Sequence, residues 1–137
     1  MMEDSSIGER PPSRHDSLPF HLSPYPRTTI PTSKNFYLRT LGFEDDTHMR
    51  PSTLPFPGAF VRGGAQQIHL MELPNPDPTR GRPEHGGRDR HVAFTVEDIE
   101  PLLERLKEGG VPFTMSKSGR RAVFCRDPDG NALEFME

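Results

Sequence analysis

Residues 68–72 read IHLME and residues 133–137 read LEFME, so two apolar positions, a methionine and a glutamate recur in the same register. In the strand that each stretch predicts, successive side chains point to opposite faces. His69 in the first copy therefore takes the place of Glu134 in the second. Imidazole and carboxylate groups both bind metals, so a repeated unit with these residues at equivalent points predicts a shared site.

The sequence before the second copy predicts a clear order of elements. The stretch RHVAFTV (90–96) alternates apolar and other residues, which predicts a strand with one apolar face. A helix is expected between Asp98 as its N-cap and Gly109 at its end. Its apolar residues recur at helical spacing: Ile99, Leu102, Leu103 and Leu106. VPFTMS, RRAVFCR and ALEFM predict three further strands, with DPDG as a turn. The second half is therefore predicted to be a βαβββ unit.

The first half of the chain repeats this order less regularly. SKNFYLRTLGF (33–43) predicts a short helix ending at Gly42, and GAFVRGG and QQIHLMEL predict two strands. The opening strand is expected around residues 20–31, although three prolines there remove donors that a sheet ladder needs. We predict an α+β fold of two βαβββ modules. Its segments are a disordered tail at 1–19, module one at 20–73, a flexible polar linker at 74–89 and module two at 90–137.

Composition excludes several classes of function. The 137 residues carry a formal net charge of −3, which offers no electrostatic case for nucleic acid or an anionic membrane as a partner. No apolar run approaches the ~20 residues of a membrane span, and the N-terminus lacks a signal-peptide pattern. The single cysteine, Cys125, cannot form an internal disulfide and is expected to be a small core or cavity residue. We expect a cytoplasmic protein that acts on a small molecule.

Alternation also predicts where the polar candidates point. Gln67, His69 and Met71 face away from Ile68 and Leu70, and Glu134 faces away from Leu133 and Phe135. His91 likewise opposes the apolar face of its strand. We therefore expect His69, His91 and Glu134 on the sheet faces that the helices leave open. A lone histidine on a strand is more often a hydrogen-bonded structural residue. His15, His48 and His85 are read as solvent-exposed, with His85 able to approach the mouth of the site but not required there.

The stretches HVAFTVEDIEPLLERLKEGGV, FCRDPDGNALEF and NFYLRTLGF resemble the glyoxalase/bleomycin-resistance/extradiol-dioxygenase superfamily, the vicinal-oxygen-chelate fold, over about residues 20–137. The resemblance implies two modules that pair their sheets into an open barrel around a divalent metal. It implies metal ligands at His21, His69, His91 and Glu134; a site of three ligands without His21 stays open. Such a donor set suits Zn, Ni, Co, Mn or Fe(II).

The resemblance implies metal-assisted chemistry, with Glu134 as both ligand and catalytic base. A lyase or isomerase acting on a small oxygenated substrate is the first expectation, although His69 and Leu73 stand where glyoxalase I usually has a glutamate and an asparagine. A ring-cleaving dioxygenase would use His21, His91 and Glu134 as its triad. A protein that binds a small ligand without chemistry is the alternative from another class. A homodimer is expected, because many members complete their barrels across chains.

Overall fold

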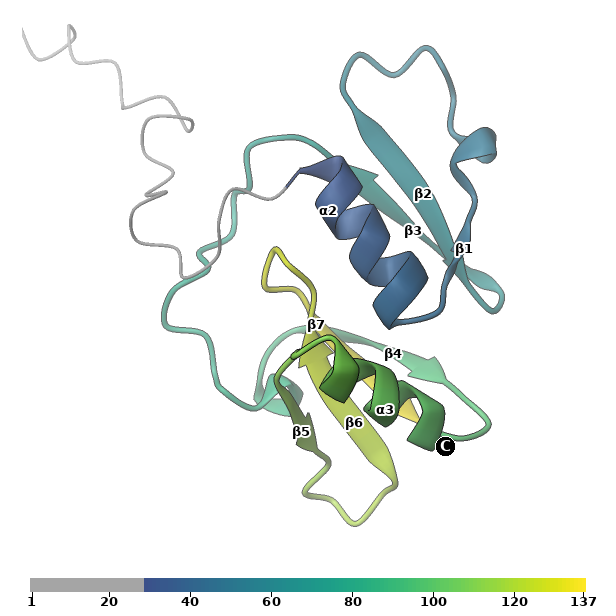
Figure 1. Cartoon of the computed structure of the whole chain (residues 1–137). Helices are drawn as coiled ribbons and strands as arrows, with labels where there is room; N and C mark the ends of the chain where they lie inside the picture. The colour runs from purple at the N-terminus through teal and green to yellow at the C-terminus, as the bar shows by residue number, and fades with distance from the viewer. Residues whose placement is uncertain (1–28) are drawn as a thin grey trace, which may run out of the picture.

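The computed structural model describes residues 29–137, which form two units, each with a helix lying over one face of a sheet (Figure 1). The first unit begins with helix α2 (Ile30–Asn35), which continues as the π-helical turn η2 (Phe36–Thr40). Strands β1 (Glu44–Asp45), β2 (Gly58–Gly63) and β3 (Gln66–Met71) follow in an antiparallel sheet of order β1-β2-β3. The two strands predicted after the first helix are thus confirmed, and β1 is an addition.

The first helix begins three residues earlier than predicted. The hydroxyl of Thr29 accepts from the amide of Thr32, and proline stands in the first turn, where its missing N–H costs nothing. Beyond η2 the backbone turns at Gly42, whose φ of +76° is unfavourable for residues with a side chain. The helix therefore ends close to the predicted glycine.

The second unit follows the predicted order. Strand β4 (His91–Thr95) leads to helix α3 (Glu100–Glu108), then to β5 (Phe113–Met115), β6 (Ala122–Arg126) and β7 (Ala132–Met136). The sheet order is β4-β7-β6-β5, with β4 parallel to β7 and the other pairs antiparallel. One detail differs: Ile99, not Asp98, is the N-cap, and Asp98 instead accepts a hydrogen bond from the amide of Glu100. The βαβββ prediction is confirmed for this unit.

A single hydrophobic core joins the two units. It contains side chains from α2 and η2, from α3, and from the helix-facing sides of both sheets. The ring of Phe43 packs edge-on against Phe94 and Phe135, with centroids 5.2 and 6.3 Å away. A buried hydrogen bond from Tyr37 Oη to Asp127 Oδ2, 2.7 Å long, also crosses between them. The units are therefore held together through their helix sides.

The proposed opening strand and His21 lie outside the described residues. The linker is not simply a loop, because Gly86–Arg88 form a 3-10 turn, η4, and neighbouring arginines are ion-paired. Among residues 29–137 no helix is long and apolar enough to cross a membrane.

Candidate functional site

His91 and Glu134 come together on the open face of the second sheet. In the parallel register of β4 and β7, His91 lies beside Ala132 and Ala93 lies beside Glu134. Since side chains alternate, both residues point away from Phe94, Leu133 and the helix. His91 Nε2 lies 3.1 Å from Glu134 Oε2, and 28% and 12% of the two side chains are exposed. The pair is partly shielded but open to a small molecule.

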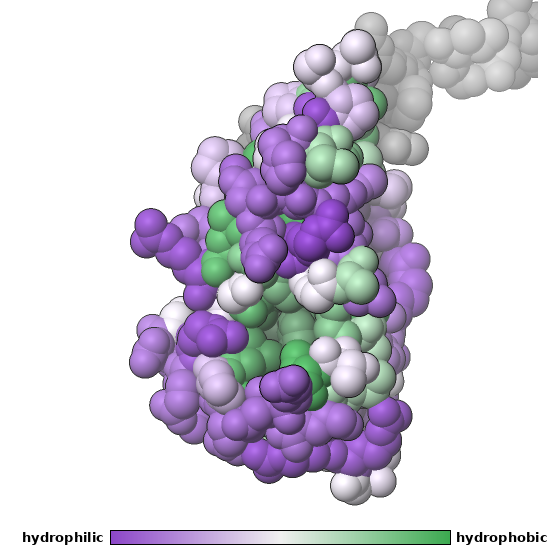
Figure 2. All heavy atoms as spheres, turned by 90° about the vertical axis from the view of Figure 1, so that its right-hand side faces the viewer, coloured by the Kyte–Doolittle hydropathy of each residue, from purple (hydrophilic) through white to green (hydrophobic). Residues whose placement is uncertain are grey.

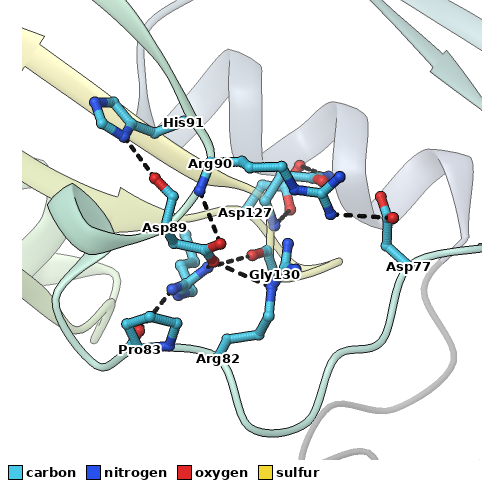
Figure 3. Close-up of polar contacts among 10 residues, drawn as sticks. Asp77, Arg82, Pro83, Asp89, Arg90, His91, Asp127 and Gly130 are labelled. Carbon is cyan, nitrogen blue, oxygen red and sulfur yellow. Dashed lines mark hydrogen bonds and ion pairs between the residues drawn. The ribbon is translucent and has the colours of Figure 1, made fainter.

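The second nitrogen of His91 already has a partner. Nδ1 lies 2.8 Å from the backbone oxygen of Asp89 (Figure 3), and because a carbonyl only accepts, Nδ1 must carry a hydrogen. In the neutral ring the Nε2 lone pair then faces the carboxylate of Glu134. Two electron-pair donors at this separation need a proton or a metal cation between them.

His69 lies on the open face of the first sheet, paired across the strands with Phe60. Its ring stacks on that of Phe60 with centroids 3.6 Å apart. Its Nε2 lies 2.8 Å from the side-chain oxygen of Gln67, whose amide nitrogen in turn donates to Asp46. The placement on the open face agrees with the strand alternation, and a polar chain orients the imidazole.

The described residues do not assemble the four-ligand set that the sequence suggested. Among residues 29–137 no three His, Cys, Asp or Glu side chains could hold one metal ion together, so His69 does not join His91 and Glu134 within the chain. The physical reason is that the units share their helix-side core, and no strand pairing joins the two open faces in this part of the chain. His21 lies outside the described residues.

His85 is a site residue that sequence reasoning missed, because a histidine in a polar linker was read as solvent-exposed. Its Nδ1 lies 2.6 Å from Thr114 Oγ1 on β5. Its ring meets Phe124 edge-on at 4.8 Å, and His91 meets the same phenyl ring at 5.3 Å. Phe124 is itself opposite Glu134 in the sheet register. His85, His91 and Glu134 thus surround one buried aromatic ring.

Two glycines allow the linker to lie this close to the sheet. Gly86 is buried, and a Cβ there would lie 3.4 Å from the side chains of Ala132 and Phe124. A Cβ on Gly87 would lie only 2.7 Å from His85 Nε2. The Gly-Gly pair after His85 was the available sequence signal, since glycine often marks close backbone approach.

A cleft of about 750 Å³ lies between linker residues 79–86 and the β5–β6 edge. Its apolar walls include Phe36, Val111, Phe113 and Phe124, and Arg80 is among its polar lining residues. Thr114 and Phe124 belong both to this cleft and to the surroundings of His85. Volumes of this size accommodate small organic ligands. The cleft therefore shares Phe124 with the surroundings of His91, while neither His91 nor Glu134 lines it.

Asp89, two residues before His91, lies between two arginines. Its carboxylate is 8% exposed and lies 2.8 Å from Arg126 Nη1 and 3.1 Å from Arg82 Nε. Burial alone would raise the pKa of Asp89. The hydrogen bonds from Arg126 and the Arg90 amide, with the charge of Arg82, nevertheless hold the pKa below its usual value. Asp89 is therefore a permanent anion at neutral pH.

Comparisons with known proteins agree with this architecture. Residues 21–135 match the family model of the Glyoxalase/Bleomycin resistance protein/Dioxygenase superfamily. The chain is 33% identical over 119 residues to the uncharacterized protein YaeR of Escherichia coli (strain K12), covering 80% of this chain and 88% of that protein. It is 30% identical over 112 residues to "Glyoxylase I 4" of Arabidopsis thaliana, covering 78% of this chain but 63%, less than two thirds, of that relative.

Among solved structures, a glyoxalase family protein from Bacillus anthracis superposes with a TM-score of 0.63 at 26% identity, over 78% of this chain and 82% of the other. The match of sequence and of structure extends over most of the residues that carry both helix-backed sheets. The chain belongs to the Glyoxalase/Bleomycin resistance protein/Dioxygenase superfamily.

Proposed function

We propose that this protein is a divalent-metal-dependent enzyme of its superfamily, a lyase or isomerase acting on a small oxygenated substrate. The observation that carries the proposal is the His91–Glu134 pair, with one imidazole nitrogen fixed by a carbonyl and the other aimed at a carboxylate 3.1 Å away. An imidazole tied through its far nitrogen is the usual arrangement of a metal-ligating histidine.

The separation of the pair fits a shared ion. Two ligand atoms each about 2.1 Å from one metal lie roughly 3.0 Å apart at a right angle and about 3.4 Å apart at the tetrahedral angle. The observed 3.1 Å lies within that range. Nitrogen and carboxylate oxygen suit Zn, Ni, Co, Mn or Fe(II). Direct measurement of bound metal distinguishes a shared ion from an ion pair of the two side chains.

We assign the remaining ligands to the first unit of a second chain, as His69 and His21. The support is the repeat, which makes His69 the counterpart of Glu134, and the absence of His69 from the His91–Glu134 pair within one chain's described residues. An apolar hollow with a hydrophilic rim (Figure 2) supports a homodimer, since such surfaces mark protein contacts. The open barrel of the family would then be completed between chains.

The chain's own residues divide the chemical work. Bound at this pair, a divalent metal would act as a Lewis acid toward the substrate oxygens. Glu134 Oε2 faces His91, while Oε1 has no hydrogen bond within residues 29–137 and is available to accept a proton from the substrate. Phe124 packs against His91 and also lines the cleft, so we assign the body of the substrate to that cleft.

A second candidate function is small-ligand sequestration without chemistry. The specific observation in its favour is that only two of the four suggested ligands meet in the described part of one chain. A cleft of about 750 Å³ beside an incomplete metal set would suit a binding protein.

Metal analysis separates these functions. After loading with Ni²⁺, Co²⁺ or Zn²⁺ and desalting, the wild type should retain about one ion per chain, and His91→Ala, Glu134→Ala and His69→Ala should lose it. His48→Ala and Glu72→Ala are matched controls on exposed side chains and should retain it. A wild type that takes up no metal overturns the proposal and favours sequestration. A methylglyoxal–glutathione assay on the loaded protein then tests the lyase reading.

Subunit mixing tests the cross-chain site. His69→Ala and His91→Ala chains, each without metal, should regain about half of the metal sites of the wild type within mixed dimers, because one of the two sites is then intact. No recovery in confirmed mixed dimers would overturn the cross-chain assignment of His69, and a monomeric wild type in light scattering would also contradict the dimer.

A further inference from the structure

The carboxylate of Asp89 fastens the linker to the second sheet. It pairs with Arg82 in the linker at 3.1 Å (Figure 3). It also pairs with Arg126 at the end of β6 at 2.8 Å. Arg126 is only 18% exposed, so this pair is largely shielded from water. Shielded charges of this kind hold a fixed geometry only when their other hydrogen-bonding atoms are also satisfied.

Arg126 meets that condition through its remaining donors. Its Nη1 also donates to the carbonyl of Gly130 at 2.7 Å, and its Nη2 donates to the carbonyl of Pro83 at 2.7 Å. The guanidinium thus connects the β6–β7 turn, the linker and Asp89. This planar fork is specific to arginine, because a lysine ammonium cannot span the same acceptors with fixed directions.

The backbone of the same aspartate contacts the candidate metal ligand. The carbonyl of Asp89 accepts from His91 Nδ1 at 2.8 Å, and its carboxylate also accepts from the amide of Arg90 at 2.8 Å. Fixing the Asp89 side chain therefore fixes the peptide whose oxygen selects the hydrogen position on His91. The opposite nitrogen of that ring is the one aimed at Glu134.

We propose that the ion pair between Asp89 and Arg126 is a positioning device, which keeps the hydrogen of His91 on Nδ1 and directs Nε2 toward Glu134. The inference rests on the proposed metal function and deepens it, because Asp89 and Arg126 act only through His91. Supporting partners of ligating histidines typically change metal affinity by about 10- to 100-fold. If the Asp89–Arg126 ion pair only held the linker in place, its removal would leave the His91 tautomer and the metal affinity unchanged.

The test has two readouts. In Zn²⁺-loaded protein, where the metal takes the place of any proton between His91 Nε2 and Glu134, long-range ¹H–¹⁵N NMR of the His91 ring reports which nitrogen carries the hydrogen. In metal-loaded protein, Co²⁺ titration followed by absorption gives the affinity. Arg126→Gln should convert a single Nδ1–H tautomer into a mixture and weaken Co²⁺ binding by about 10-fold or more. Arg126→Lys should keep only part of the wild-type preference for the Nδ1–H tautomer and only part of the wild-type Co²⁺ affinity. Arg82→Gln removes the other cation beside Asp89 and should change the tautomer and the affinity in the same direction but by less. It provides the test if Arg126→Gln does not fold.

Arg121→Gln is the matched control, since it removes an arginine ion-paired with Glu100 and Glu137 just before the same strand. It should leave the tautomer and the affinity unchanged. Folded Arg126→Gln protein with the wild-type tautomer and Co²⁺ affinity within twofold would overturn the inference. A wild type that binds no Co²⁺ would instead refute the proposed function, and the inference that rests on it.

Discussion

Replacing Tyr37 with phenylalanine should weaken the junction between the two units. Tyr37 and Asp127 are each 2% exposed, and the phenol donates to the carboxylate over 2.7 Å. The substitution removes one oxygen and leaves the ring, so little packing is lost. The effect measured is then that of a buried hydrogen bond to a charged acceptor.

The expected loss of stability depends on the hydrogen bonds that Asp127 retains. A hydrogen bond to a charged group contributes about 1.5–3 kcal/mol. Asp127 retains donors from the side chain and amide of Asn131 and from the amide of Asp129, so its charge is not stranded. We therefore expect a loss of about 2 kcal/mol in the free energy of unfolding. For a domain of this size that lowers Tm by roughly 8 °C.

The loss should depend on pH in a defined direction. Burial raises the pKa of Asp127, while the hydrogen bonds from Asn131 and Tyr37 oppose that rise. Removing the phenol therefore raises the folded-state pKa further above the unfolded value of about 3.9. A raised carboxyl pKa means that the folded state binds protons more tightly, so its stability recovers as pH falls through the folded pKa. The difference between variant and wild type should be largest at neutral pH and shrink in acid.

Urea unfolding of a double-mutant cycle measures the energy of the Tyr37–Asp127 interaction. Tyr37→Phe, Asp127→Asn and the double variant, each followed by circular dichroism at pH 7, give the coupling energy between the two side chains. A coupling below about 0.5 kcal/mol would mean that this bond does not hold the units together.

Three further predictions concern other parts of the chain. Burial raises the pKa of the Cys125 thiol to about 12, so a thiol reagent at pH ~8 should modify it only after unfolding; equal rates in native and denatured protein would contradict this. Gly87→Ala should displace His85 and destabilise the fold by about 1 kcal/mol in urea, because its Cβ would lie 2.7 Å from His85 Nε2; an unchanged His85 NMR signal would contradict it. The hydrogen bond from Lys34 is the main cause that lowers the pKa of Asp45 to about 2. The stabilisation that the ionised Asp45 gives the fold is therefore present above pH ~4 and lost as pH falls toward 2. Lys34→Met should flatten that part of the curve of stability against pH.

Much of the fold was predictable because its signals are local. Alternation in RHVAFTV and ALEFM and the DPDG turn predicted the second unit nearly completely, and they also predicted the open-face placement of His91 and Glu134. The two-residue strand β1 was not predictable, since so short a segment has no period to detect. The helix start at Ile30 depended on a cap that the proline-rich surroundings concealed.

The linker shows why the rest of the site could not be predicted. Its composition is that of a flexible loop, yet Asp89 pairs with Arg126, 37 residues further along the chain. His85 likewise contacts Thr114 across 29 residues. Such pairings depend on the three-dimensional path of the chain and leave no periodic trace in the sequence. Whether two open faces meet also depends on how units pack, which strand patterns do not encode.

Arg126 and Asp127 are adjacent at the end of β6, but Arg126 belongs to the candidate site and Asp127 to the junction between the two units. Successive strand residues point to opposite sides, so Arg126 reaches the linker and the Asp89–His91 path, whereas Asp127 reaches Tyr37 on the helix side. Substitutions at the two places should therefore change different properties. Arg126→Gln should change the His91 tautomer far more than the junction between units, and Tyr37→Phe should lower Tm while leaving that tautomer as it is. If both variants altered both properties equally, site and junction would form one coupled network.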